Sequence, residues 1–183
     1  GYICRAFDDA SDGTCMGEGF MAMVLKPLTQ AVKDRDHIYA IIKGSWINHG
    51  GKTNGYTVPN PRSQAALISK AIQRAMINPR TISYIEAHGT GTSLGDPIEI
   101  TGLEESFREF TDEKQFCAIG SVKSNIGHLE SAAGVAGITK VLLQLKHKQL
   151  VPSIHSNQLN PNIDFDKSPF YVHQGLEEWK QPQ

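Results

Sequence analysis

Residues 84–100 read YIEAHGTGTSLGDPIEI, which is the end of a short buried strand at 82–87, a loop of glycine and threonine, and the start of a helix. Asp96 can cap that helix, because its carboxylate can accept hydrogen bonds from free backbone N–H groups of the first turn. Pro97 suits the first turn, and Glu99 lies near the positive end of the helix dipole. The inward face is predicted to carry Ile100, Leu103, Phe107 and Phe110. This order predicts one strand–loop–helix unit of an α/β fold.

Similar elements flank this unit on both sides. Runs of apolar and β-branched residues predict strands at 20–28, at 37–51 with a bend at Gly44, at 116–121 and at 170–173. A helix is predicted to begin at Pro61 and to stop before Asn78 and Pro79. Its inward face would be formed by Leu67, Ile68, Ala71, Ile72, Ala75 and Met76. Because strands and helices alternate, the sequence predicts α/β architecture with a mostly parallel sheet.

The last predicted helix, at 131–147, is unusual in its first half, where small residues dominate. These small residues are Ala132, Ala133, Gly134, Ala136 and Gly137. A glycine inside a helix costs roughly 1 kcal/mol relative to alanine, so we expect another element to pack very close to this half. The face turned toward the core is predicted to carry Val135, Ile138, Leu142 and Leu145.

The composition argues against several classes of partner. The 183 residues contain 18 Lys and Arg against 19 Asp and Glu, so the sequence predicts no nucleic-acid partner. No apolar run approaches the ~20 residues of a membrane span, so none is expected. The three cysteines, Cys4, Cys15 and Cys117, have unrelated spacings. Unpaired thiols are typical of a reducing compartment, and we therefore expect a cytoplasmic protein.

Two histidines each follow a predicted buried strand at a glycine-containing turn. His88 follows the strand at 82–87, and His128 follows the strand at 116–121 and the turn VKSNIG. Because the carboxyl ends of parallel strands open on one side of a sheet, these histidines can converge there. Lys123 lies in the same turn as His128, and a nearby ammonium disfavours protonation of an imidazole. Two neutral imidazoles that each donate an N–H would stabilise an enolate or a tetrahedral oxyanion.

The loop after His88 has the residues of a ligand-binding turn. Its glycines allow the backbone to turn through positive φ and to approach a ligand closely. Thr90 and Thr92 add hydroxyl groups that can bind an extended, amide-bearing ligand.

The residues alone leave three alternatives open. Each histidine can be a structural residue with satisfied hydrogen bonds, as we assume for the other five. Glu86, His88 and His128 can form a metal site of two histidines and one carboxylate, although Lys123 argues against a second cation there. The run GTSLG resembles a nucleophile elbow and would make Ser93 a hydrolase nucleophile. A P-loop is excluded because the glycine run lacks the GK[ST] ending.

Two long motifs then point to a family. EAHGTGTSLGDPIE (86–99) and SVKSNIGHLESAAGVAG (121–137) resemble the two histidine motifs of β-ketoacyl synthases, the condensing domains of polyketide and fatty acid synthases. CRAFDDASDGTCMGEGFMAMVLKPL (4–28) resembles the segment before them, and LVPSIHSNQLNPNIDF (150–165) the segment after. The run NGYTVPNP (54–61) favours the modular type I polyketide synthase branch, with a bacterial multi-module synthase as the parent.

The resemblance implies a thiolase-like fold of five αβαβα layers, of which the chain would hold the C-terminal portion. Residues 1–52 would be the end of the first half, and 53–183 most of the second half. The small-residue helix would then lie in the middle layer. The complete domain would pair as a homodimer and act beside other synthase modules. The chain starts without methionine, which agrees with a segment of a larger, multifunctional protein.

The resemblance also implies the chemistry, a decarboxylative Claisen condensation of malonyl-type extender units with acyl groups. Both substrates travel on the phosphopantetheine arm of an acyl carrier protein, and the chain itself is expected to bind no cofactor or metal. His88 and His128 match the family's two decarboxylation histidines, and Lys123 matches the lysine that supports the second of them. Thr90 and Thr92 match threonines that contact the phosphopantetheine arm.

Two family features do not occur in the sequence. The nucleophilic cysteine motif should lie upstream of residue 1, and none of Cys4, Cys15 and Cys117 has its context, so all three are expected to be structural. The glycine-rich Phe-Gly-x-x-Gly-Thr-Asn segment should follow the LEEW run at 176–179. We therefore expect the isolated chain to be inactive as an enzyme. The alternative is a non-catalytic piece with a structural or interaction role.

Overall fold

The strand β2 (Cys117–Gly120) is the centre of a three-stranded parallel sheet with the order β1-β2-β4. β1 (Tyr84–Glu86) and β4 (Phe170–Val172) pair with it on either side, so that Tyr84 faces Ala118 and Phe170 faces Cys117. The strands predicted at 82–87, 116–121 and 170–173 and the parallel sheet are thus confirmed. The structure is a computed structural model and describes residues 2–53, 55 and 58–180; Asn54, Tyr56 and Thr57 of the NGYTVPNP run lie outside the described residues.

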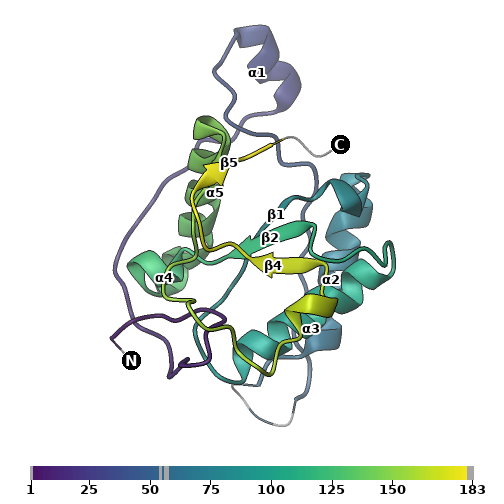
Figure 1. Cartoon of the computed structure of the whole chain (residues 1–183). Coiled ribbons are helices and arrows are strands. Elements are labelled where there is room, and N and C mark those ends of the chain that lie inside the picture. The colour runs from purple at the N-terminus through teal and green to yellow at the C-terminus, as the bar shows by residue number, and fades with distance from the viewer. Residues whose placement is uncertain (1, 54, 56–57, 181–183) are drawn as a thin grey trace.

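Helices cover both faces of this sheet (Figure 1). Successive side chains of a strand point to opposite faces. Ile119 therefore packs on one side with Ile100 and Phe107, and Ala118 on the other side with Tyr84. The first face is covered by α2 (Pro61–Ala75) and α3 (Gly95–Arg108), and the second by α5 (Ala133–His147). The described residues thus form three layers around the sheet.

The helix α2 forms as the sequence predicts. Asn60 caps it by accepting a hydrogen bond from Ser63 N at 3.2 Å, and Pro61 occupies the first helical position. Ile72 and Ala75 are buried as expected. Met76 is 90% exposed, because the chain leaves the helix at this residue in a left-handed conformation.

The helix α3 keeps its predicted apolar face but not its predicted cap. Ile100, Leu103 and Phe107 are buried, whereas Phe110 lies beyond the helix end and is half exposed. Asp96 does not cap α3, because it lies inside the first turn and its carboxylate is aimed at two other segments. The hydroxyl of Thr92 instead accepts from Gly95 N at 3.1 Å.

The helix α5 has the predicted extent but turns a different face to the sheet. Ile138 and Leu145 are exposed, and the buried side is formed by Ala136, Gly137, Lys140 and Gln144. The reason lies on β1, where the carboxylate of Glu86 faces the helix and ion-pairs with Lys140. The expectation of close packing holds at Gly137, where a Cβ would lie 3.1 Å from Glu86 Cγ, but Gly134 has open space around it.

The strands predicted at 20–28 and 37–51 are wrong for the described chain. Residues 20–27 and 37–51 form no helix or strand, and α1 (Leu28–Asp34) begins where the first of them was expected to end. A strand needs a neighbour that pairs with its backbone N–H and C=O groups, and no described segment provides one. Gly44 allows contact with α2 rather than a bend in a strand, since a Cβ there would lie 2.7 Å from Ala75 N.

Short elements complete the described part. They are η1 (Pro79–Thr81), α4 (Lys123–Ile126), η2 (Glu130–Ala132), η3 (Phe165–Lys167) and an antiparallel pair of β3 (Gln149–Leu150) with β5 (Glu177–Glu178). Within the described ranges, no helix combines the length and the apolar character that crossing a bilayer requires.

Candidate functional site

The two histidines meet at the carboxyl-terminal edge of the parallel sheet. His88 follows β1, and His128 follows the α4 turn after β2. Their ring centroids are 5.3 Å apart and their planes are nearly perpendicular, at 84°. The predicted convergence is therefore confirmed, although the two residues come from different strand–helix units.

Contacts on both sides fix the backbone and ring of His128. Its N–H donates to Cys15 O at 2.7 Å, and its carbonyl accepts from Gly17 N at 3.1 Å. The ring Nδ1 accepts from Glu130 N at 2.8 Å. An imidazole nitrogen that accepts a hydrogen bond carries no proton, so the neutral ring must carry its proton on Nε2. His128 is thus prepared to donate from Nε2.

Gly127 makes this arrangement of His128 possible. Its φ is 74°, and a Cβ there would lie 2.9 Å from Cys15 O. Any other residue would push the N-terminal segment away from the histidine.

A carboxylate that sequence reasoning did not assign to the site holds the His88 loop. Glu99, in the second turn of α3, accepts from His88 N at 2.6 Å and from Gly89 N at 2.8 Å. Gly89 has a φ of 42°, and a Cβ there would lie 2.7 Å from Ser121 Cβ. Burial raises the pKa of Glu99, and its two backbone hydrogen bonds lower it. The sequence feature that could have identified Glu99 is its position at the start of the helix that directly follows the His88 loop.

Lys123 contacts the first histidine. Its Nζ donates to His88 O at 2.6 Å, and the side chain is buried. Ser121 Oγ donates to the same carbonyl at 3.3 Å. Burial lowers the pKa of Lys123, while the carboxylates of Glu99 and Glu86 raise it. No contact between the Lys123 ammonium and the His128 ring is among those the structure describes, so its support of the second histidine stays a prediction.

The His88 ring is held in its neutral form. Burial of the ring, then the positive charge of Lys123 and then His128, lower the pKa of His88 to about 4. The residue as a whole is nevertheless exposed to solvent. At neutral pH His88 is therefore an uncharged imidazole that can donate one N–H.

The two threonines lie side by side on the loop between His88 and α3. Their hydroxyl oxygens are 3.4 Å apart, and both side chains are half-buried. The carbonyl of Thr90 accepts from Thr14 Oγ1 at 3.1 Å and from Cys4 Sγ at 2.9 Å. Asp96 joins the N-terminal segment to the loop, because its carboxylate accepts hydrogen bonds from Phe7 N at 2.8 Å and from Gly91 N at 3.2 Å. The N-terminal segment thus holds the loop.

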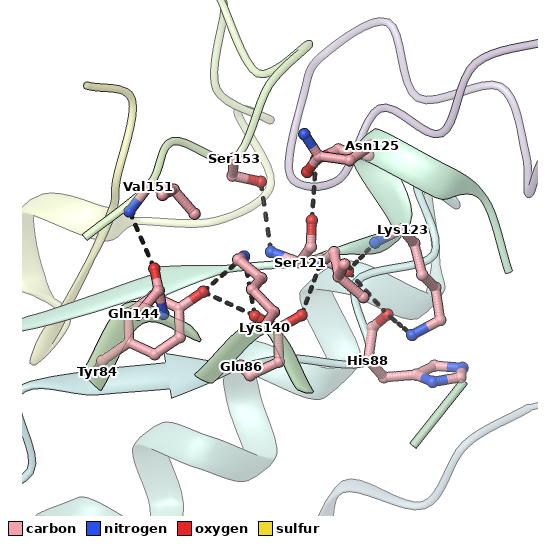
Figure 2. A network of polar contacts seen from close by, with 12 residues as sticks. Tyr84, Glu86, His88, Ser121, Lys123, Asn125, Lys140, Gln144, Val151 and Ser153 are labelled. Atoms are coloured by element: carbon pink, nitrogen blue, oxygen red, sulfur yellow. Dashed lines mark hydrogen bonds and ion pairs between the residues drawn. The ribbon is translucent and has the colours of Figure 1, made fainter. Parts of the chain in front are cut away.

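A second polar group, which was not foreseen, lies around Glu86 on the same strand end as His88 (Figure 2). Glu86 Oε2 contacts Lys140 Nζ at 2.9 Å and accepts from Tyr84 Oη at 2.7 Å. Glu86 Oε1 accepts from Val122 N at 2.5 Å. The carboxylate that the metal alternative needs is therefore engaged elsewhere. No group of three or more metal-ligating side chains occurs among the residues that the structure describes.

The cysteines lack the surroundings of a nucleophile. Burial raises the pKa of Cys4, and it raises that of Cys117 to about 12, whereas reactive thiols have lowered pKa values. Cys15 is half-buried and lies in the strand-like segment beside His128. Ser93 is exposed in the turn before α3.

Comparisons with known proteins place these features in a family. Residues 39–157 match the family described as β-ketoacyl synthase, C-terminal domain. Polyketide synthase PksL of Bacillus subtilis is 69% identical over 179 residues, which are 98% of this chain and 4% of that protein. Polyketide synthase ThaG of Burkholderia thailandensis is 56% identical over 180 residues, which cover 98% of this chain and 3% of its own length.

Solved structures agree with this match. The ketosynthase from module 6 of the bacillaene synthase of B. subtilis 168 is 52% identical, with a TM-score of 0.96 over 99% of this chain and 33% of that chain. The oxazolomycin ketosynthase domain OzmH KS7 of Streptomyces albus is 48% identical, with a TM-score of 0.95 over 97% and 31% of the two chains. The predicted partial thiolase-like fold is confirmed. The chain spans a third of these ketosynthases and a few per cent of PksL.

Proposed function

Because this chain belongs to the β-ketoacyl synthase family, we propose that it supplies the decarboxylation part of a polyketide synthase ketosynthase. The observation that carries the proposal is the meeting of His88 and His128, two rings with centroids 5.3 Å apart at the mouth of a parallel sheet. Within the complete domain the chain would act on malonyl-type extender units, and alone it would be inactive.

The proposed step is the loss of CO₂ from a malonyl thioester. The bond between the carboxylate carbon and the α-carbon breaks, and its electron pair becomes the enolate. Negative charge then develops on the thioester oxygen. Neutral His88 and the Nε2–H of His128 would donate hydrogen bonds to that oxygen, which is stabilisation aimed at the transition state. The enolate would attack an acyl thioester on a cysteine that this chain does not contain.

The other site residues take supporting roles in this proposal. Lys123, after burial, helps to lower the pKa of His88, and it donates to the carbonyl of His88 at 2.6 Å. Thr90 and Thr92 would bind the phosphopantetheine arm of an acyl carrier protein, the substrate carrier, with no cofactor bound by the chain itself. The rest of the ketosynthase domain, the neighbouring modules and a second copy in a homodimer are the other proposed partners. A cytoplasmic location is proposed for the parent enzyme.

The test separates the two half-reactions in a complete ketosynthase domain carrying this sequence. His88→Ala and His128→Ala should each lower the conversion of malonyl to acetyl carrier protein by about 10²-fold or more, because an oxyanion donor is lost. Acylation of the nucleophilic cysteine, followed by intact mass, should remain close to that of the wild type. Loss of acylation with decarboxylation retained would contradict these roles.

A further inference from the structure

Three side chains form a closed, buried group between β1 and α5, here called the Glu86 network: Tyr84, Glu86 and Lys140 (Figure 2). Lys140 Nζ lies 2.9 Å from Glu86 Oε2 and donates to Tyr84 Oη at 2.7 Å. Tyr84 Oη in turn donates to Glu86 Oε2 at 2.7 Å. The side chains of Lys140 and Glu86 are only 8% and 11% exposed. The pair is therefore desolvated and fully directed inward.

Two glycines leave room for the Glu86 network. A Cβ at Gly137 in α5 would lie 3.1 Å from Glu86 Cγ, and a Cβ at Gly120 in β2 would lie 3.0 Å from Tyr84 Oη. Glycine in the interior of a helix or strand is destabilising. Gly137 lies inside α5 and carries that penalty, whereas Gly120 is the last residue of β2. A larger residue at either position would press on the network.

The third partner of Glu86 connects the network to His88. Glu86 Oε1 accepts from Val122 N at 2.5 Å. The residues on either side of Val122 both donate to His88 O, Ser121 through Oγ at 3.3 Å and Lys123 through Nζ at 2.6 Å. One carboxylate thus holds the middle of a three-residue turn whose two ends hold the carbonyl of the first histidine.

Stability alone is a weak reason for such a pair. Replacing a buried ion pair by apolar side chains of similar volume is often neutral or stabilising, so an ion pair by itself contributes little to the fold. A hydrophobic pair, however, could not accept the N–H of Val122. Misplacement of a reacting group by about 1 Å can lower a rate by roughly 10²-fold, so anchoring this turn has a direct value for the chemistry.

We propose that Glu86 is a positioning residue of the decarboxylation site, which acts through the hydrogen bond from Val122 N to set the Ser121–Lys123 turn against His88. Lys140 offsets the charge of the buried carboxylate, and Tyr84 completes its partners. The inference rests on the proposed function, because it assigns a support to the same histidines. It adds to that site a residue of the sheet whose charge partner lies on α5.

A pair of matched double variants isolates this hydrogen bond in a complete domain carrying the sequence. Glu86→Leu with Lys140→Met removes both charges and also the acceptor for Val122 N. Glu86→Gln with Lys140→Met removes the same charges but keeps an amide oxygen for Val122 and an amide N–H for Tyr84. The control is Glu104→Leu with Arg108→Met, which removes an ion pair on the outer helix α3.

The leucine variant should lower kcat for malonyl decarboxylation by about tenfold or more with KM unchanged, because the turn is displaced. The glutamine variant should retain the rate within about threefold, and the α3 control should be unchanged. All three should still acylate the nucleophilic cysteine and unfold cooperatively. Equal rates in the leucine and glutamine variants would overturn the proposal.

A single variant covers the case in which the leucine variant does not fold. Gly137→Ala raises helix propensity but places a methyl group against Glu86 Cγ, so it should fold and still slow decarboxylation several-fold. An unchanged rate in this variant would also overturn the proposal. His88→Ala is measured in parallel. If His88→Ala keeps full decarboxylation, the proposed function itself is wrong. If His88→Ala loses decarboxylation but the network variants retain it, only the positioning role of Glu86 is wrong.

Discussion

His88 and His128 differ in what holds their rings. His128 is fixed by the hydrogen bond from Glu130 N to Nδ1, which settles its neutral tautomer. His88 is fixed through its backbone, with its N–H on Glu99 and its carbonyl on Lys123 and Ser121. Its protonation state follows from burial and from the Lys123 ammonium. At this scale the position of His88 depends on the Glu99 carboxylate and the Lys123 ammonium, which both contact the backbone of the His88 loop.

The protonation of His88 can be measured directly. In the complete domain, imidazole-labelled NMR should give His88 a pKa of about 4. Lys123→Met should raise that value toward the ordinary one, but only in part, because burial is the larger cause. Lys146→Met, at the exposed end of α5, should leave it unchanged. A His88 that titrates near 6.5 in the wild type would contradict this account.

The same pKa has a consequence for stability with a definite sign. The unfolded chain binds a proton at His88 below about 6.5, whereas the folded chain binds it only near 4. Between these values the unfolded state holds more protons, so this residue lowers the stability as the pH falls through that window.

At the scale of elements, contacts across the chain decide where helices and loops lie. In α3, Asp96 is a residue type that often caps helices. Its carboxylate instead accepts hydrogen bonds from the backbone N–H groups of residues 7 and 91 and so joins both to the first turn. α5 shows the same effect in its buried face, where Lys140 and Gln144 replace the apolar side chains that periodicity favours. Both helices form where the pattern predicts, and both are oriented by a polar group that lies elsewhere in the sequence.

Asp96 should therefore matter more than its helix position indicates. Asp96→Ala leaves Phe7 N and Gly91 N without their acceptor, and should lower the free energy of unfolding by about 1–3 kcal/mol. Asp112→Ala removes the same charge from an exposed loop and should change the free energy of unfolding by less than about 0.5 kcal/mol. Urea unfolding of the complete domain measures both. Equal effects would show that Asp96 acts only through its charge.

At the scale of the whole molecule, much apolar surface of the described chain has no partner. Phe20, Val24 and Ile47 are 95%, 97% and 89% exposed, in the segments where strands were predicted. Large apolar side chains exposed in this number promote association. The 183 residues correspond to a third of the solved ketosynthases they resemble, and the apolar pattern in these segments fits burial against further chain.

The isolated chain should associate through these segments. Light scattering after size exclusion should show oligomers at micromolar concentration, together with binding of a fluorescent apolar dye. Phe20→Ser, Val24→Ser and Ile47→Ser combined should reduce both signals. A wild-type chain that stays monomeric and binds no dye would contradict the expectation, and would favour a self-sufficient module over a part of a larger domain.

The isolated chain should also fail to accept an acyl group. Cys4 and Cys117 are buried with raised pKa values, so neither thiol forms the thiolate that attacks a thioester. Incubation with an acyl thioester donor and intact mass measurement should show no saturable acylation. Saturable labelling of one of the three cysteines would overturn this.

The sequence by itself determined the strand–loop–helix order, the parallel sheet and the two histidine loops, because these depend on local patterns: apolar runs, glycine turns and proline or glycine at helix ends. Tertiary structure alone decided that Lys123 reaches the carbonyl of His88, that Glu99 holds the His88 loop, and that Lys140 meets Glu86. It also decided that Asp96 joins two other segments rather than capping a helix. Most of these contacts join residues that are far apart in the sequence. The periodicity of apolar residues describes only local structure, so it cannot predict which distant residues meet. The predicted strands at 20–28 and 37–51 failed for the same reason, since a strand exists only where another backbone completes its hydrogen bonds.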